Sequence, residues 1–216
     1  WALLGWHDAV ADEIKQIRKG EAFIDIGANA GVFSLMAGQR VGGEGIVLAF
    51  EPQLSLFAKL VSNVQANKLT NIFCFNLAIS DWTRMVEMDG VDAQHTGIAS
   101  IHEISKKRTV NNSWAVNPSV DMKIFKKMLM DRMVTVKIDV EGHELHVLKG
   151  ISGLFESDNV RKVIVEIDGG NLRRFNTELS DLYTFMEQNN FSPTMIGSKE
   201  HHFDEIFIKN TDAYLE

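Results

Sequence analysis

Residues 23–34 read FIDIGANAGVFS, and this stretch decides the fold. The mostly apolar run 22–27 predicts a buried strand, a turn then leads to Gly31, and a helical pattern continues from Gly31 to Arg40. A buried strand, a glycine-containing turn and a helix form the first unit of an open α/β fold. Glycines let the backbone approach a ligand closely, and the start of a helix attracts an anion. We therefore expect a ligand to bind at this turn.

The same alternation of strand and helix continues along the chain. The apolar runs predict further strands at 45–51, 71–78, 133–139 and 162–168, and the helical patterns predict helices at 54–67, 144–155 and 178–189. Segments 191–196 and 202–209 predict a terminal antiparallel hairpin, because they are too close in sequence for a crossover. The pattern therefore indicates an α/β fold with a mostly parallel sheet that helices cover on both faces.

Composition narrows the class of protein. The chain has 216 residues, with 22 Lys and Arg against 29 Asp and Glu, which gives a formal charge of −7. This length predicts one domain over 1–216. We expect an N-terminal helical segment at 1–20 and an insertion at 82–118 that lies near the substrate-binding site. The acidic balance argues against a nucleic-acid partner.

Hydropathy and cysteine content bear on the location of the protein. No apolar run approaches the roughly 20 residues of a membrane helix, so we expect no membrane span. No signal peptide is readable, and Cys74 is the only cysteine, which excludes an intrachain disulfide and a cysteine-based metal site. We expect a cytoplasmic protein. The sequence does not predict the oligomeric state.

Glu51 is the second ligand-suited residue, at the end of the second predicted strand and 24 positions after Gly27. A carboxylate at this place accepts hydrogen bonds from ribose hydroxyls in nucleoside-cofactor folds, and Pro52 suits the start of the next helix. A dinucleotide fingerprint, G-x-G-x-x-G, would require glycines where Asn29 and Val32 stand. The turn therefore favours S-adenosylmethionine. Two alternatives remain: an NAD-dependent oxidoreductase, and a non-catalytic nucleotide-binding or partner-binding domain.

The densest group of ionisable residues is VKIDVEGHEL at 136–145. Asp139 and Glu141 are two apart on an extended segment, so they point to one side, and Glu166 could bring a third carboxylate near them. Such acids can cap a helix, bind Mg²⁺ or Ca²⁺, or take a proton from an acceptor. We predict catalytic roles for Asp139, Glu141 and His143 and assign no metal ligand.

Other histidines give weaker signals. His143 and His146 are three apart on a predicted helix, but the sequence shows no third ligand to complete a metal site with them. His201 and His202 fall in the terminal hairpin, where we expect them at the surface.

Taken together, these segments resemble the FkbM-family methyltransferases. The resemblance is carried by FIDIGANAGVFS at 23–34, FEP at 50–52, NVQAN at 63–67, AISD at 78–81 and VKIDVEGHELHVLKG at 136–150. It implies a seven-stranded Rossmann-like fold and S-adenosylmethionine as methyl donor. Members typically O-methylate a hydroxyl of a sugar, glycolipid or secondary metabolite, so the implied partner is a small-molecule or glycan acceptor.

The resemblance also implies roles for individual residues. The methionine end of the cofactor would lie against Asp25, Gly27, Asn29 and Gly31, the ribose against Glu51, and the adenine near Ala78 and Ile79. We add Ala28 and Pro52, which adjoin these positions, to the expected cofactor contacts. Asp139 and Glu141 would face the transferring methyl and the acceptor.

Overall fold

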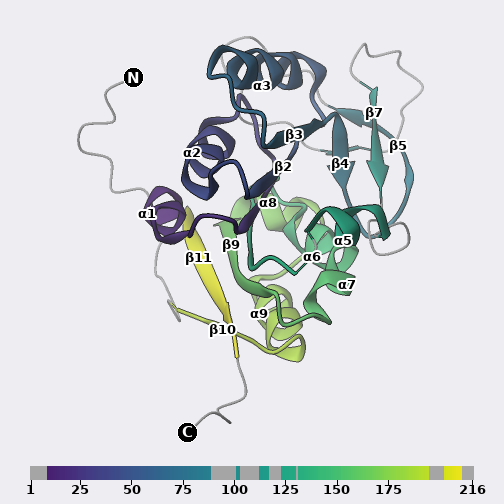
Figure 1. The fold of residues 1–216 in the computed structure, drawn as a ribbon. Helices are drawn as coiled ribbons and strands as arrows, with labels where there is room; N and C mark the ends of the chain where they lie inside the picture. The colour runs from purple at the N-terminus through teal and green to yellow at the C-terminus, as the bar shows by residue number, and fades with distance from the viewer. Residues whose placement is uncertain are drawn as a thin grey trace, which may run out of the picture.

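A computed structural model describes residues 9–88, 101–102, 112–116, 123–129, 131–194 and 202–210. Seven strands of this part form one sheet in the order β10-β11-β9-β8-β1-β2-β3 (Figure 1). The strands are β1 (Ala22–Ile26), β2 (Ile46–Phe50), β3 (Ile72–Phe75), β8 (Val134–Ile138), β9 (Val160–Asp168), β10 (Phe191–Pro193) and β11 (His202–Lys209). All neighbours pair in parallel except β11, which runs antiparallel to β9 and β10. The predicted seven-stranded α/β sheet and C-terminal hairpin are confirmed.

Helices cover both faces of this sheet, as predicted. One face carries α1 (Ala9–Gln16), α2 (Val32–Val41) and α3 (Leu54–Ala66), whose apolar residues pack with Phe23, Val47 and Ile164. The other face carries α5 (Lys123–Leu129), α6 (Glu144–Gly150), α7 (Ser152–Phe155), α8 (Gly169–Arg174) and α9 (Leu179–Gln188). Burial of two apolar faces supplies the main driving force for this layered arrangement. The helical segment predicted at 1–20 contains α1, and residues 1–8 lie outside the described part.

The strand predicted at 71–78 differs from the observed structure. It ends at Phe75, and β4 (Leu77–Ile79) then leaves the main sheet. Between them, the Asn76 side-chain amide donates to the carbonyls of Glu51 and Pro52 at 2.9 and 3.0 Å. This side chain takes the place of strand pairing and directs the chain over the carboxyl ends of the parallel strands.

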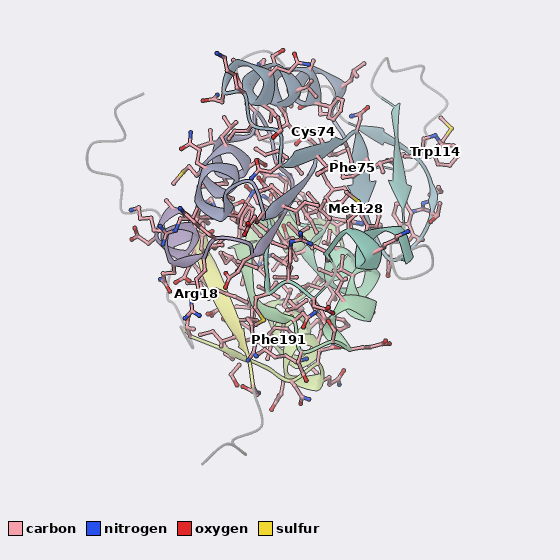
Figure 2. All side chains as sticks on the ribbon, viewed as in Figure 1. Arg18, Cys74, Phe75, Trp114, Met128 and Phe191 are labelled. Atoms are coloured by element: carbon pink, nitrogen blue, oxygen red, sulfur yellow. The ribbon has the colours of Figure 1, made fainter. Side chains whose placement is uncertain are left out.

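A second sheet of four described strands accounts for part of the 82–118 insertion. Its order is β4-β7-β5-β6, with β5 (Arg84–Met88), β6 (Ile101–His102) and β7 (Asn112–Val116). Trp114 projects outward from β7, whereas Phe75 packs inward, where its ring stacks on Phe50 (Figure 2). The remaining residues of the insertion lie outside the described part.

Within the described ranges, every helix is too short or too polar to cross a membrane.

Candidate functional site

The turn after β1 lies against the ends of the two neighbouring strands. The N–H groups of Gly27 and Ala28 both donate to the Phe50 carbonyl at 3.0 Å. Gly27 has a φ of +81°, and a Cβ there would lie 1.8 Å from the Asp139 carbonyl oxygen. Only glycine fits this contact, because it lacks a Cβ and tolerates positive φ. The turn is thereby held at the carboxyl-end edge of the sheet, where α/β folds bind ligands.

Glu51 ties this turn to the end of β2. Its Oε2 accepts the Asn29 N–H and its Oε1 accepts the Gln53 N–H, each at 2.8 Å. Burial raises the pKa of Glu51 to about 7, against the opposing effect of these two hydrogen bonds. Its carboxyl is therefore fixed in place where it borders a cavity.

That cavity, which we call the Glu51 cavity, gathers most of the predicted cofactor contacts. Residues from the ends of β1, β2, β4, β8 and β9 line it: Gly27, Asn29, Glu51, Pro52, Ala78, Ile79, Asp139, Glu141 and Glu166, with five apolar neighbours. These residues are far apart in the sequence. The parallel sheet and the departure of β4 bring them together.

Three other predicted contacts do not border the Glu51 cavity in the described structure. Asp25 is fully buried, where it accepts a hydrogen bond from the Ser34 hydroxyl at 2.5 Å. Gly31 packs under Leu60, 2.5 Å from where its Cβ would stand. Ala28 lines a neighbouring cavity instead. Asp25 and Gly31 therefore support the turn through buried contacts and do not border the cavity.

Lys137 is a site residue that the sequence analysis missed. It is 3% exposed, and its Nζ lies 3.0 Å from Asp139 Oδ2 and 3.6 Å from Asp25 Oδ1. The ammonium also donates to the Gly27 carbonyl at 3.1 Å. These two acids outweigh burial and raise the pKa of Lys137, so the lysine stays charged. A lysine between valine and isoleucine in a buried strand was the available signal, since such a lysine requires an acidic partner.

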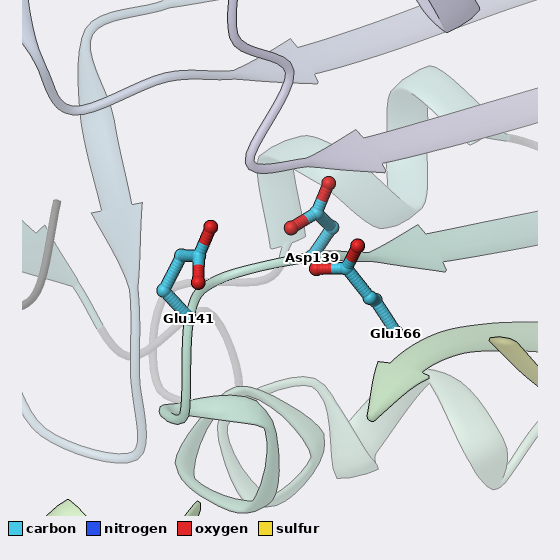
Figure 3. Close-up of side chains that lie close together, drawn as sticks. All are labelled: Asp139, Glu141 and Glu166. Carbon is cyan, nitrogen blue, oxygen red and sulfur yellow. The ribbon is translucent and has the colours of Figure 1, made fainter. Parts of the chain in front are cut away.

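Three carboxylates meet beside Lys137, as expected, although Glu141 reaches the cluster from a left-handed turn with a φ of +56° and not from an extended segment. Asp139, Glu141 and Glu166 each have an oxygen within 4.8 Å of the others. Figure 3 shows the carboxyls of Asp139 and Glu166 next to each other at the ends of two strands, with Glu141 across from Asp139. Burial, a hydrogen bond to Asp139 and the charge of Asp139 raise the pKa of Glu166 to about 8. Asp139 keeps a lowered pKa because Lys137 and this hydrogen bond outweigh its burial.

Oxygen donors of this kind suit Mg²⁺ or Ca²⁺ in their chemistry. Here the cluster already has hydrogen-bond partners from the chain: Lys137 donates to Asp139, and His202 Nε2 lies 2.9 Å from Glu166 Oε1. In addition, Asn171 Nδ2 donates to Glu141 Oε2 at 2.8 Å. A divalent ion would have to displace these partners, so the arrangement does not fit a metal and we assign no metal step.

His143, the third predicted catalytic residue, lies inside the protein and away from this cluster. It is 2% exposed, its Nε2 lies 2.9 Å from the Ser80 hydroxyl, and its ring stacks on His146. Burial lowers the pKa of His143 to about 3, with a smaller contribution from His146. His143 does not line either of the two described cavities at the carboxyl ends of the strands. The geometry therefore does not support its predicted role as a base.

Glu144, by contrast, has the structural role that the sequence left open. Its Oε1 accepts the N–H of Gly142 at 2.9 Å, and the side chain is 2% exposed. This bond fixes the turn that precedes α6. Burial raises the pKa of Glu144 to about 7.

A second cavity of about 460 Å³, the Phe33 cavity, adjoins the first. It lies between α1 and α2 and is lined by Ala11, Lys15, Ala28, Ala30, Val32, Phe33, Met36 and Lys137, together with Gly27, Asn29 and Asp139. The last three residues also line the Glu51 cavity. Asp139 therefore stands on the wall between two spaces of different character.

Comparison with known proteins identifies the family. The methyltransferase FkbM domain matches residues 25–193. The chain belongs to the FkbM methyltransferase family. The predicted resemblance is thus confirmed, and so is S-adenosylmethionine as the cofactor; the oxidoreductase alternative is not favoured.

Among curated proteins, hexuronic acid methyltransferase AglP of Haloferax volcanii is 29% identical to the chain over 175 residues, which cover 78% of this chain and 64% of AglP. The chain thus spans less than two thirds of that relative.

Solved structures support the fold. Methyltransferase FkbM from Methylobacillus flagellatus superposes with a TM-score of 0.56 at 14% identity, over 87% of this chain and 43% of that one. TrmK of M. capricolum, solved with S-adenosylhomocysteine, gives a TM-score of 0.51 at 13% identity, over 94% of this chain and 69% of TrmK.

Proposed function

We propose that this FkbM-family chain transfers the methyl group of S-adenosylmethionine to a hydroxyl oxygen of a sugar or a sugar-containing metabolite. The observation that carries the proposal is the position of Asp139, which lines both the Glu51 cavity and the Phe33 cavity. A carboxylate between two adjoining spaces can serve a reaction between two bound molecules.

The Glu51 cavity has the residues to hold the cofactor. Glu51 offers carboxylate oxygens for ribose hydroxyls, while Pro52, Ala78 and Ile79 provide apolar surface for a base. Gly27 and Asn29 place backbone near Asp139, where the methionine end belongs. When bound, S-adenosylmethionine supplies an electrophilic methyl group, and the protein's own part is to orient the two reactants.

The Phe33 cavity is the proposed acceptor site. Phe33 and Met36 give it an apolar side on which a sugar ring can pack, and Asp139 and Lys137 give it a polar side. Asp139 is ionised, because its pKa is lowered by Lys137, and it can take the proton of an acceptor hydroxyl.

The relative AglP supports a sugar as the acceptor class. AglP is named for methylation of hexuronic acid, a sugar that carries hydroxyls and a carboxylate. The acidic cluster of Asp139, Glu141 and Glu166 favours a neutral hydroxyl at the reacting position over a second carboxylate, because like charges repel.

The test is methyl transfer from S-[methyl-¹⁴C]adenosylmethionine to glucuronic acid, galacturonic acid and their neutral methyl-ester derivatives. Alkali cleaves a methyl ester and leaves a methyl ether intact, so treatment of the product identifies the oxygen. We expect label that survives alkali. Label released by alkali would place transfer on a carboxylate and overturn the hydroxyl assignment. Absence of S-adenosylhomocysteine binding by calorimetry would overturn the proposal as a whole.

A further inference from the structure

A chain of hydrogen-bonded side chains leads from Asp139 to the protein surface. Asp139 and Glu166 have carboxyl oxygens within 4.8 Å of each other and lie side by side (Figure 3). Burial and a hydrogen bond to Asp139 raise the pKa of Glu166, so at neutral pH this pair holds one proton, on Glu166. His202 Nε2 lies 2.9 Å from Glu166 Oε1, and the His202 side chain is 60% exposed. The path therefore begins at the wall between the two cavities and ends in solvent.

The strands explain why this histidine meets the cluster. β11 runs antiparallel to β9, with His202 opposite Asp168 and Asp204 opposite Glu166. Side chains two residues apart on a strand point to the same face, so all four lie on one side of the sheet. His202 reaches diagonally across the pair to Glu166.

The charges around this path come from several elements. Asp168 and Asp204 act with Glu166 on His202, and the hydrogen bond to Glu166 is the largest effect that raises its pKa. The charge of Lys137 faces Asp139. Glu141 also interacts electrostatically with His202, Asp168 and Arg174. Glu166 therefore stands between an acid that stays ionised and a histidine in contact with water.

We propose that Asp139, Glu166 and His202 form a proton path that carries the acceptor's hydroxyl proton from the site to solvent. This inference rests on the proposed hydroxyl methylation, since transfer to an ionised carboxylate would release no proton. His202 is a relay residue in this path and lies outside both described cavities.

The transfers balance without an added reactant. The hydroxyl oxygen forms a bond to the methyl carbon, the sulfur–methyl bond breaks with its electron pair left on sulfur, and the hydroxyl proton moves to Asp139. The protonated Glu166 passes its proton to neutral His202 and receives the proton of Asp139. His202 then releases its proton to water, and the three groups return to their starting state.

The first test needs no turnover. In imidazole-labelled protein with S-adenosylhomocysteine, the His202 NMR titration is followed in the wild type and in Glu166→Gln and Asp139→Asn, with His202→Gln used to assign the signal. We expect the wild-type midpoint to lie above that of an ordinary histidine and to fall in Glu166→Gln, with a further change in Asp139→Asn. A midpoint that is unaffected by either substitution would overturn the path.

The second test measures single-turnover methyl transfer to the hydroxyl acceptor found above. His202→Ala should lower the rate at least about tenfold, which is less than the roughly 100-fold or more of a general base that contacts the substrate, because His202 acts through Glu166. The acceptor KM should stay the same, and added imidazole should restore the rate, since it can enter the exposed position. A rate equal to that of the wild type would overturn the proposal. It would also be overturned if EDTA abolished transfer by the wild type and Mg²⁺ restored it, because the carboxylates would then hold a metal ion.

His146→Ala is the matched control. His146 Nδ1 lies 2.9 Å from Asp81 Oδ1, a histidine–carboxylate pair like that of His202, and it lines neither described cavity. We expect its transfer rate to be unchanged and insensitive to imidazole. An imidazole response equal to that of His202→Ala would contradict the path. Total absence of transfer would count against the proposed function, and an intact NMR linkage would then support only the coupling of His202 to Glu166 and Asp139.

Discussion

The two halves of residues 139–146 have opposite surroundings. Asp139 and Glu141 border the Glu51 cavity, whereas His143 and Glu144 are 2% exposed and bond to Ser80 and to the Gly142 N–H. One half is placed for chemistry and the other holds the local structure. A dense run of ionisable residues therefore does not form a single site.

The turn between the halves produces this difference. Glu141 has a φ of +56° and Gly142 a φ of +107°, and a Cβ on Gly142 would lie 2.4 Å from the Asn171 carbonyl oxygen. Two consecutive residues with positive φ reverse the chain direction sharply. A residue other than glycine is strained in this left-handed conformation. The strain falls on Glu141, whose carboxylate faces the cluster.

The largest effect on stability should follow from removing the charge of Lys137, which lies beside Asp139. Lys137→Met leaves Asp25 and Asp139 without their buried partner, which should lower the free energy of unfolding by about 3–5 kcal/mol. Urea denaturation measures this. Lys15→Met is the control, because Lys15 pairs with Asp12 at the surface and should cost less than about 1 kcal/mol. Equal losses in the two variants would contradict the role of Lys137.

The next largest effect should be on cofactor affinity, and it should distinguish a glutamate that borders the Glu51 cavity from a buried glutamate of the structural half. Glu51→Ala should weaken S-adenosylhomocysteine binding roughly 10- to 100-fold, the worth of about 1.5–3 kcal/mol for a hydrogen bond to a charged group. Glu144→Gln alters another buried glutamate with a raised pKa, but one outside the cavity. Calorimetry should find that Glu144→Gln binds S-adenosylhomocysteine as tightly as the wild type. Equal weakening in Glu51→Ala and Glu144→Gln would argue that Glu51 does not contact the cofactor.

The smallest effect concerns His143 and depends on pH. Burial lowers the pKa of His143 to about 3 in the folded protein. Below the ordinary histidine pKa, this residue is therefore protonated in the unfolded chain but still neutral in the folded protein. Wild-type stability contributed by this group is therefore present above about pH 6.5 and declines as pH falls.

His143→Gln should cost about 1 kcal/mol near neutral pH, from the altered bond to Ser80. Its difference from the wild type should then change in favour of the variant by on the order of 2 kcal/mol between about pH 7 and pH 5. Thermal denaturation across this range checks the slope. A constant difference would show that His143 titrates normally.

Much of the fold was readable from the sequence, because strands buried on both faces appear as continuous apolar runs between helical patterns. The break at Asn76 was not, since it depends on side-chain bonds to Glu51 and Pro52 that are distant in sequence. The second sheet was equally hidden, because the short segments Arg84–Met88 and Asn112–Val116 pair with each other and with β6 and β4, and the sequence pattern does not show these pairings.

The site was predicted in part for a similar reason. The sequence predicted that Asp139 and Glu141 lie together on an extended segment, but β8 ends at Ile138 and Glu141 is in a left-handed turn. The end of the next parallel strand suggested Glu166. The position of His202 depends on the register of an antiparallel strand, which the sequence pattern does not fix. His143 was misleading because a left-handed turn redirects the chain just before it.

The most direct test of this account compares the two halves in one reaction. Single-turnover methyl transfer is measured for Asp139→Asn and His143→Gln at saturating cofactor and with the same hydroxyl acceptor. The account predicts a loss of about 100-fold or more for Asp139→Asn, as expected for removal of a general base, and a rate near that of the wild type for His143→Gln. A large loss in His143→Gln with little change in Asp139→Asn would contradict it.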